Sequence, residues 1–150
     1  MIRNAALSVT ALALSVALPV ALSAASAWSQ DAQPAKGLQV ELNAVVPSER
    51  GCVFTFVVGN QLEKSVASAK FEFVLFNGTG TVERMIVLDF RDLPQGKTKV
   101  RQFDLPGTQC DNVKRILIND SPVCEGEGIA AGACMSGIVT RSNTQVGFEG

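Results

Sequence analysis

The stretch "LQVELNAVVPSERGCVFTFVVGN", residues 38–60, decides the fold class. Its first run puts four apolar side chains on one face of an extended chain: Leu38, Val40, Leu42 and Ala44. After the turn-forming segment "PSERG", a second run does the same: Cys52, Phe54, Phe56 and Val58. Alternation with a period of two is the pattern of a β-strand with one face in a core. We therefore predict strands over residues 38–45 and 52–60.

Similar runs follow along the chain, separated by segments rich in Gly, Pro and Asn. Their content of β-branched and aromatic residues predicts further strands at 70–78, 81–90, 98–105 and 113–120, with a shorter one at 144–148. In the first two of these, the residues predicted to face inward are Phe71, Phe73 and Leu75, then Val82, Ile86, Leu88 and Phe90, interrupted by Arg84.

Three connecting segments allow more specific predictions. Asn77-Gly78 predicts a two-residue hairpin turn. Residues 60–70 could form one or two helical turns, although they lack a sustained apolar stripe. The glycine-rich segment at 125–134 predicts a loop.

Seven short strands with turns about every ten residues predict an all-β fold: an immunoglobulin-like β-sandwich over residues 38–150. The chain has eight phenylalanines, and most of them lie in strand runs. We interpret them as core residues rather than as a cofactor site. One domain accounts for the whole predicted folded part.

The N-terminal segment has the pattern of a secretory signal peptide. Arg3 precedes a run of Ala, Leu and Val, and the small-residue motif "ASA" ends at Ala27. This order predicts a signal peptide over residues 1–27, cleaved after Ala27, and a flexible leader at 28–37. The alternative is an uncleaved anchor, because an apolar run of about 18 residues can span a bilayer. A twin-arginine signal would need two adjacent arginines, and this segment has one arginine.

Charge and hydropathy favour a periplasmic protein without nucleic-acid or membrane partners. Signal removal takes away Arg3 and leaves twelve basic and fourteen acidic residues, a net charge of about −2. This balance gives no electrostatic reason to expect nucleic acid or an anionic membrane surface. Charged residues interrupt every later apolar run, so no membrane association is expected after cleavage.

All four cysteines follow the predicted signal peptide, at Cys52, Cys110, Cys124 and Cys134. Disulfides persist in the oxidising compartments that exported proteins enter. The chain has neither a C-x-x-C motif nor a histidine, so a redox pair or a zinc site is not predicted. No metal or other cofactor is expected.

Strand parity ranks the possible disulfide pairings. If consecutive strands alternate in direction, the start of the second strand and the end of the fifth lie at the same end of the sandwich. Cys52 and Cys110 occupy those two places. Cys124 follows the sixth strand at the opposite end, with Cys134 shortly after it. We therefore expect the pairs Cys52–Cys110 and Cys124–Cys134.

No catalytic constellation stands out, and we predict that the protein is not an enzyme. Histidine, the usual general base of Ser-His and Cys-His enzymes, is absent. Adjacent Lys64 and Ser65 carry no specific signal. Single carboxylates are spread along the chain at Asp89, Asp92, Asp104, Asp111 and Asp120. Two of them would have to meet in a cleft for glycosidase-like chemistry, whereas Asp after a strand is ordinary turn chemistry.

Two asparagines match the N-glycosylation pattern, Asn77 in "NGT" and Asn119 in "NDS". Both stand where a strand is predicted to end. We interpret both as turn residues.

The segments "FEFVLFNGTGTV", "LDFRDLPQGKTKVRQFDLPGTQC" and "ILINDSPVC" carry a family resemblance. The chain resembles small exported proteobacterial proteins of unknown function that are often labelled "Tat pathway signal sequence domain protein". More distantly, it is similar to FxLYD-type immunoglobulin-like domains. Both resemblances imply an exported β-sandwich, and neither implies catalytic or binding residues at particular positions.

These observations favour a non-enzymatic protein that binds another protein or an envelope component. Sandwiches expose edge strands, and an edge can take up a partner's strand. The strands at 113–120, with Lys114 and Arg115 at its start, and at 38–43 are candidate edges. The alternatives are a thiol-based redox or metal-handling protein, or an enzyme of unrecognised type that uses carboxylates.

Overall fold

The computed structural model describes residues 36–150, and the predicted signal peptide and nearly all of the predicted leader lie outside these residues. Within them the chain forms eight strands and one short 3-10 turn. The elements are β1 (Leu38–Pro47), β2 (Gly51–Asn60), β3 (Val66–Phe76), β4 (Val82–Leu93), β5 (Thr98–Pro106), η1 (Cys110–Asn112), β6 (Arg115–Glu125), β7 (Val139–Ser142) and β8 (Gly147–Glu149).

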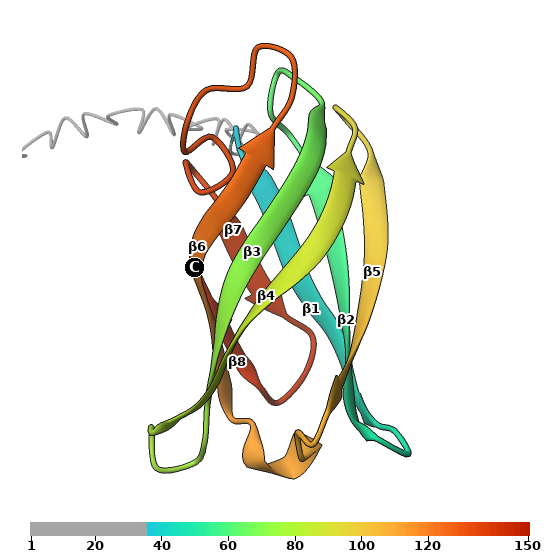
Figure 1. Cartoon of the computed structure of the whole chain (residues 1–150), viewed down its shortest axis with the longest axis vertical. Coiled ribbons are helices and arrows are strands. Elements are labelled where there is room, and N and C mark those ends of the chain that lie inside the picture. The colour runs from blue at the N-terminus through green and yellow to red at the C-terminus, as the bar shows by residue number, and fades with distance from the viewer. Residues whose placement is uncertain (1–35) are drawn as a thin grey trace, which may run out of the picture. The chain divides into compact units, whose positions relative to one another are not determined.

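The strands form two four-stranded sheets that pack as a sandwich (Figure 1), which confirms the predicted fold class. Sheet A has the order β5-β2-β1-β7, and sheet B has the order β4-β3-β6-β8. The pairs β1–β2, β2–β5, β3–β4 and β3–β6 are antiparallel. The last two strands differ, because β7 pairs with β1, and β8 with β6, in parallel.

Sequence neighbours pair only within the hairpins β1–β2 and β3–β4. The other connections cross from one sheet to the other, so the fold is not a simple meander. The alternation of direction on which the disulfide prediction depends is nevertheless kept through β6, since every pair among β1 to β6 that lies side by side is antiparallel.

The core is built around five phenylalanine rings from both sheets. The ring of Phe56 lies 5.1 Å from that of Phe73, 5.6 Å from those of Phe90 and Phe148, and 6.1 Å from that of Phe103, centroid to centroid. Tilted aromatic pairs at these distances contribute about 0.5–1.5 kcal/mol each beyond area burial. The alternating face of β2 predicted from the sequence, Cys52 to Val58, is buried as expected.

Bulges overturn two of the predicted inward positions. The register between β1 and β2 shifts at Leu42/Ala44, and Val45 rather than Ala44 packs against the core beyond it. An extra residue reverses which side chains face inward. A similar shift at Leu75/Phe76 leaves Val82 exposed on the outer face of sheet B, opposite Phe76.

Two predicted turns also differ in the structure. The β3–β4 connection is the five-residue loop 77–81, not a two-residue turn. The Asn77 side-chain oxygen accepts hydrogen bonds from the backbone N–H groups of Thr79 and Thr81, at 3.0 and 2.9 Å, and Gly80 has φ of 81°. Asn77 is thus a turn residue, as expected, but it organises a longer loop.

Asn119 and Asp120 were expected at a turn, and this prediction is wrong. Strand β6 continues past them to Glu125. Proline lacks an N–H, so Pro122 is tolerated where a strand has an open side, and β8 covers only the first residues of β6. Ser121 Oγ lies 3.1 Å from the Lys70 carbonyl oxygen and so ties this irregular part of β6 to β3.

The remaining differences concern short segments. The alternative of helical turns at 60–70 is not adopted: a loop of five residues precedes β3 at Val66. The predicted strand at 144–148 is reduced to β8, and β7 was not predicted at all. Within residues 36–150 no helix has the length and apolar character of a membrane span.

Candidate functional site

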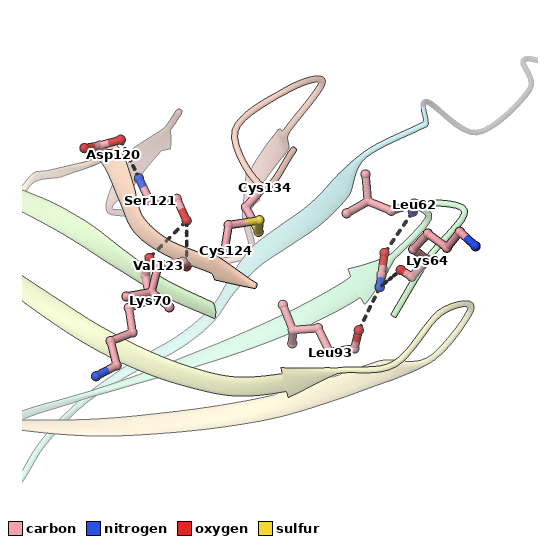
Figure 2. Close-up of a disulfide and its surroundings, with 10 residues drawn as sticks. Leu62, Lys64, Lys70, Leu93, Asp120, Ser121, Val123, Cys124 and Cys134 are labelled. Carbon is pink, nitrogen blue, oxygen red and sulfur yellow. Dashed lines mark hydrogen bonds between the residues drawn. A yellow bond between two sulfur atoms is a disulfide. The ribbon is translucent and has the colours of Figure 1, made fainter. Parts of the chain in front are cut away.

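The four cysteines form two disulfides, Cys52–Cys110 and Cys124–Cys134, which are the pairs expected from strand parity. Their Cα atoms lie 5.2 and 5.9 Å apart. The first joins the start of β2 to η1, and the second joins the end of β6 to the loop before β7, at the opposite end of the sandwich (Figures 1 and 2). With both bridges formed, no cysteine presents a free thiol.

The bridges indicate what the cysteines do for the fold and where the fold forms. On the chain-entropy model, closing a loop of 58 residues stabilises the fold by about 4 kcal/mol, and a loop of 10 by about 3 kcal/mol. Disulfides of this kind point to an oxidising, exported environment. The cysteines are therefore structural staples in this state.

Three of the five candidate aspartates are paired with cations. Asp89 lies 3.8 Å from Lys70, Asp92 lies 3.2 Å from Lys99, and Asp104 lies 2.6 Å from Arg50. Asp111 is in η1, and Asp120 is in β6. Among residues 36–150 there is no cluster of three His, Cys, Asp or Glu side chains that could hold a metal ion.

Hydrogen bonds account for the shifted carboxyl pKa values in this set. The hydroxyl of Ser48 donates to Asp104 at 2.8 Å, and Arg50 donates as well, so the pKa of Asp104 is lowered. Lys99 holds the pKa of Asp92 low in the same way. A lowered pKa keeps a carboxylate ionised, which suits an ion pair and not a general acid.

Lys64 and Ser65 do not form a nucleophile–base pair. Ser65 Oγ accepts a hydrogen bond from the backbone N–H of Gln95 at 3.0 Å. The preceding loop is held by the buried Asn60 amide, which donates to the carbonyl oxygens of Leu93 and Lys64 at 2.7 and 3.0 Å (Figure 2). This arrangement fixes the loop and leaves the Ser65 oxygen engaged with backbone.

A hollow of about 450 Å³ lies beside this loop, near the Cys124–Cys134 bridge. Its apolar lining comes from Leu62, Ile129 and nearby alanines, and its polar groups include Lys64 and the exposed pair Lys36–Glu63 at 2.9 Å. It offers no convergent set of buried polar groups, which a specific small-molecule site needs.

One carboxylate is buried on the outer side of sheet A. Glu41 is only 7% exposed, and its two oxygens accept hydrogen bonds from Arg141 Nε and Asn143 Nδ2, both at 2.6 Å. The side-chain amide of Asn43 also donates to it, which contributes most to its lowered pKa. Since Arg141 belongs to β7, this cluster fastens the C-terminal segment to β1 and has no free acid–base group.

The strands proposed from sequence as exposed edges lie inside the sheets, so that prediction is wrong. Strand β1 lies between β2 and β7, and β6 lies between β3 and β8 over Arg115–Leu117, beyond which β6 has an open side that contains Pro122. The reason is the C-terminal segment, whose two short strands add to one sheet each. The edge strands in the described part of the chain are β5 and β7 in sheet A, and β4 and β8 in sheet B.

Three of these four edges are protected against pairing with another chain. β7 and β8 have four and three residues. On β5, Lys99 and Arg101 lie on the same face as Phe103 and Leu105, which pack in the core. Short edges and inward-pointing charges are devices that prevent edge-to-edge association.

Strand β4 lacks such protection at its centre. It has twelve residues, and Met85 to Leu88 are four consecutive apolar residues, "MIVL". Only its two ends are covered by polar side chains. Arg101 donates to the carbonyl oxygens of Phe90 and Asp92, at 2.7 and 3.0 Å, and Arg84 donates to that of Pro106 at 2.9 Å.

The outer face of sheet B continues this apolar edge. Met85 and Val87 are 56% and 48% exposed, although both lie in a strand. Behind Met85 the register continues through Val74, which is only 5% exposed, to Leu117, whereas the register partner of Val87 on β3 is Glu72. We call the set Val74, Met85, Val87 and Leu117 the β4 patch; it is the candidate functional site.

The sequence contained part of this signal. The run "MIVL" between charged residues was visible, but Met85 and Val87 belong to the row opposite the predicted inward row. The sequence did not show which strands would lie next to β4.

Comparisons of the chain with protein-family models, with curated proteins and with solved structures find no match. The family resemblance stays a prediction.

Proposed function

We propose that this protein is a non-enzymatic, exported β-sandwich module that binds another protein through the β4 patch and the adjoining open edge. The observation that carries the proposal is the unprotected run Met85–Leu88 on an edge strand whose counterparts are short or charged. An apolar edge strand without protecting charges can pair with other chains and aggregate. Its presence here therefore favours a role as a binding surface.

Backbone groups support the same interpretation. Within residues 36–150, β4 has no partner strand on its open side, and side chains rather than backbone groups bridge it to sheet A: Arg84 donates to the Pro106 carbonyl, Arg101 donates to the Phe90 carbonyl, and Lys99 pairs with Asp92. A partner's extended segment could supply the missing backbone hydrogen bonds, with alternate side chains beside Met85 and Val87. Periplasmic localisation, with a cleaved signal peptide, is part of the proposal and agrees with the two disulfides.

The test is site-specific photo-crosslinking in the native envelope. A photoreactive phenylalanine analogue replaces Met85 in one variant and Val100 in another. These residues are matched, because both lie on edge strands and are 56% and 58% exposed. We expect a discrete crosslinked species from position 85 and not from position 100. Equal products from both positions, or none from position 85, would contradict the proposal.

The thiol-based alternative has its own measurement. The exported protein is alkylated without reductant and its mass is determined. No added alkyl group is expected if the bridges are permanent, whereas four would mean free thiols and would favour redox or metal chemistry.

A further inference from the structure

We infer that the partner segment at the β4 edge is basic: an extended strand whose outer row places apolar side chains beside Met85 and Val87 and a Lys or Arg beside Asp89. This inference rests on the proposed function and adds the chemistry of the partner. The geometry of the edge sets the length of the segment, and the charges beside the β4 patch set its sign.

The open stretch is short and bounded. Arg84 and the Arg101-bonded Phe90 mark its two ends, which leaves Met85 to Asp89 without cover. Five residues of antiparallel strand span about 17 Å. A segment of five to seven residues fits this space.

The β4 patch borders a group of acids at one end. Asp89 lies on the same outer row of β4 as Met85 and Val87, and it pairs with Lys70 of β3. The next outward residue of β3 is Glu72, whose register partner on β6 is Asp120. Among the residues that the structure describes, neither Glu72 nor Asp120 has a salt-bridge partner.

Glu72 and Asp120 are register partners on the outer side of sheet B, with register shifts on both sides of the pair. Only neutral donors relieve the pair: the Asn119 amide donates to Glu72 and the backbone N–H of Ser121 donates to Asp120, both at 2.7 Å. A cationic side chain on an added strand would lie next to Asp89 and within reach of Glu72, and would neutralise this field.

A second copy of this chain fits less well. Antiparallel pairing of two β4 strands about the centre of Met85–Leu88 would place Asp89 of one copy beside Arg84 of the other and would supply no cation to Glu72. A basic segment supplies a cation to both Asp89 and Glu72, so it is the better complement. The occupant is therefore a different protein with a basic, strand-forming segment.

The test uses three synthetic seven-residue peptides with a fluorescent label. The first, called the Lys-Val peptide, has Val, Val and Lys at alternate positions with Thr between them. The second has Glu in place of this Lys. The third is the Lys-Val peptide with methylated backbone nitrogens, which cannot donate along a strand. Anisotropy gives affinity, and hydrogen exchange of the full mature protein locates the bound peptide.

We expect the Lys-Val peptide to slow exchange at Met85–Leu88, and the other two to bind at least about ten-fold more weakly. The double variant Glu72→Gln with Asp89→Asn should weaken Lys-Val binding about three- to ten-fold, since each peripheral charge pair contributes modestly. Glu72→Gln alone should not lower the melting temperature, because the glutamine oxygen still accepts from the Asn119 amide. An unchanged melting temperature shows that lost binding is not lost folding.

Several results would overturn the inference: equal binding of the Lys and Glu peptides, full binding of the N-methylated peptide, or protection outside β4. A dimer that Val87→Lys converts to a monomer would name a second copy as the occupant and also overturn it. These failures are separate from failure of the proposed function. A crosslink at position 85 without Lys-Val binding would keep the site and reject the basic partner.

Discussion

A sandwich of two open sheets has two seams, the two sides along which the edge of one sheet faces the edge of the other. The two seams of this molecule are closed in different ways. At the β1/β6 seam the C-terminal segment adds β7 to sheet A and β8 to sheet B, so backbone pairing covers the first part of both strands. At the β4/β5 seam no backbone pairs. The two strands meet at the turn 94–97 and then diverge (Figure 1), and arginine side chains cross between them.

The first seam stabilises the fold, whereas the second is open to a binding partner. The filled seam carries the aromatic plug Phe148 and the buried Glu41 cluster, which are features of a fold that holds itself together. The open seam leaves the centre of β4 without a partner and with exposed apolar side chains. We therefore expect substitutions at the first seam to change stability, and those at the second to change binding.

The largest effect on stability is expected from Phe148→Ala in β8. The ring lies 5.6 Å from Phe56 and 6.3 Å from Phe73, centroid to centroid, and its loss leaves a cavity between the sheets. We expect a loss of about 2–4 kcal/mol in the free energy of unfolding. Urea unfolding of the disulfide-bonded protein measures it.

The matched variant is Met85→Ala at the open seam, for which we expect a change within about 0.5 kcal/mol, because the side chain is mostly exposed. If the two variants cost the same, the distinction between the seams is wrong.

A smaller loss is expected from Arg101→Met, which keeps the aliphatic stem but removes the bonds to Phe90 and Asp92. The expected cost is about 1–2 kcal/mol. Faster hydrogen exchange at the end of β4 should accompany it. Lys99→Met on the same strand removes only a surface ion pair with Asp92 and should cost less than about 1 kcal/mol. A larger loss from Lys99→Met than from Arg101→Met would mean that the guanidinium does not close this seam.

Glu41→Gln should cost about 1 kcal/mol at neutral pH, since charge-assisted hydrogen bonds weaken but the amide still accepts one. The Asn43 amide and Arg141 lower the pKa of Glu41 in the folded protein, against the opposing effect of burial. Its contribution is therefore complete above the ordinary value near 4.5 and is lost as pH falls below it.

Stability measured from pH 7 to pH 3 should fall less steeply in the Glu41→Gln variant than in the wild type. The other carboxylates with lowered pKa values, Glu63, Asp92 and Asp104, remain in both proteins and give both a residual acid sensitivity. Parallel pH profiles for the two proteins would show that the Glu41 carboxylate does not fasten β7.

The smallest change in stability is expected from Val87→Lys, within about 0.5 kcal/mol, because the side chain is half exposed on the outer face. Its effect on function should be the largest, since a lysine on an edge strand blocks strand addition. Co-purification with the crosslinked partner should be lost. Val100→Lys on β5 is the control, and loss of co-purification there instead would move the site to sheet A.

The sequence predicted the fold because face periodicity is local. The buried face of β2 followed from the alternation of Cys52, Phe54, Phe56 and Val58 alone. It missed what depends on neighbours. A bulge after Leu42 reversed which side chains of β1 face the core in the rest of the strand. Asn119 looked like a turn residue because the hydrogen bond from Ser121 to the Lys70 carbonyl joins two strands and leaves no signal in the sequence of one.

The candidate site was missed for the same reason. Which strands are edges depends on where the last residues of the chain pair, and β7 and β8 are too short to show a period. Their parallel pairing turned the two proposed edges, β1 and β6, into interior strands. The MIVL run of β4 became the candidate site only because the structure shows that β4 is an edge strand.

Hydrogen exchange of the full mature protein, alone and with the envelope protein that the position-85 crosslink identifies, tests the central claim most directly. The account predicts that the partner slows amide exchange in Met85–Leu88 and leaves β5 and the hollow beside the Cys124–Cys134 bridge unchanged. Protection of β5 or of that hollow, with β4 unchanged, would contradict it.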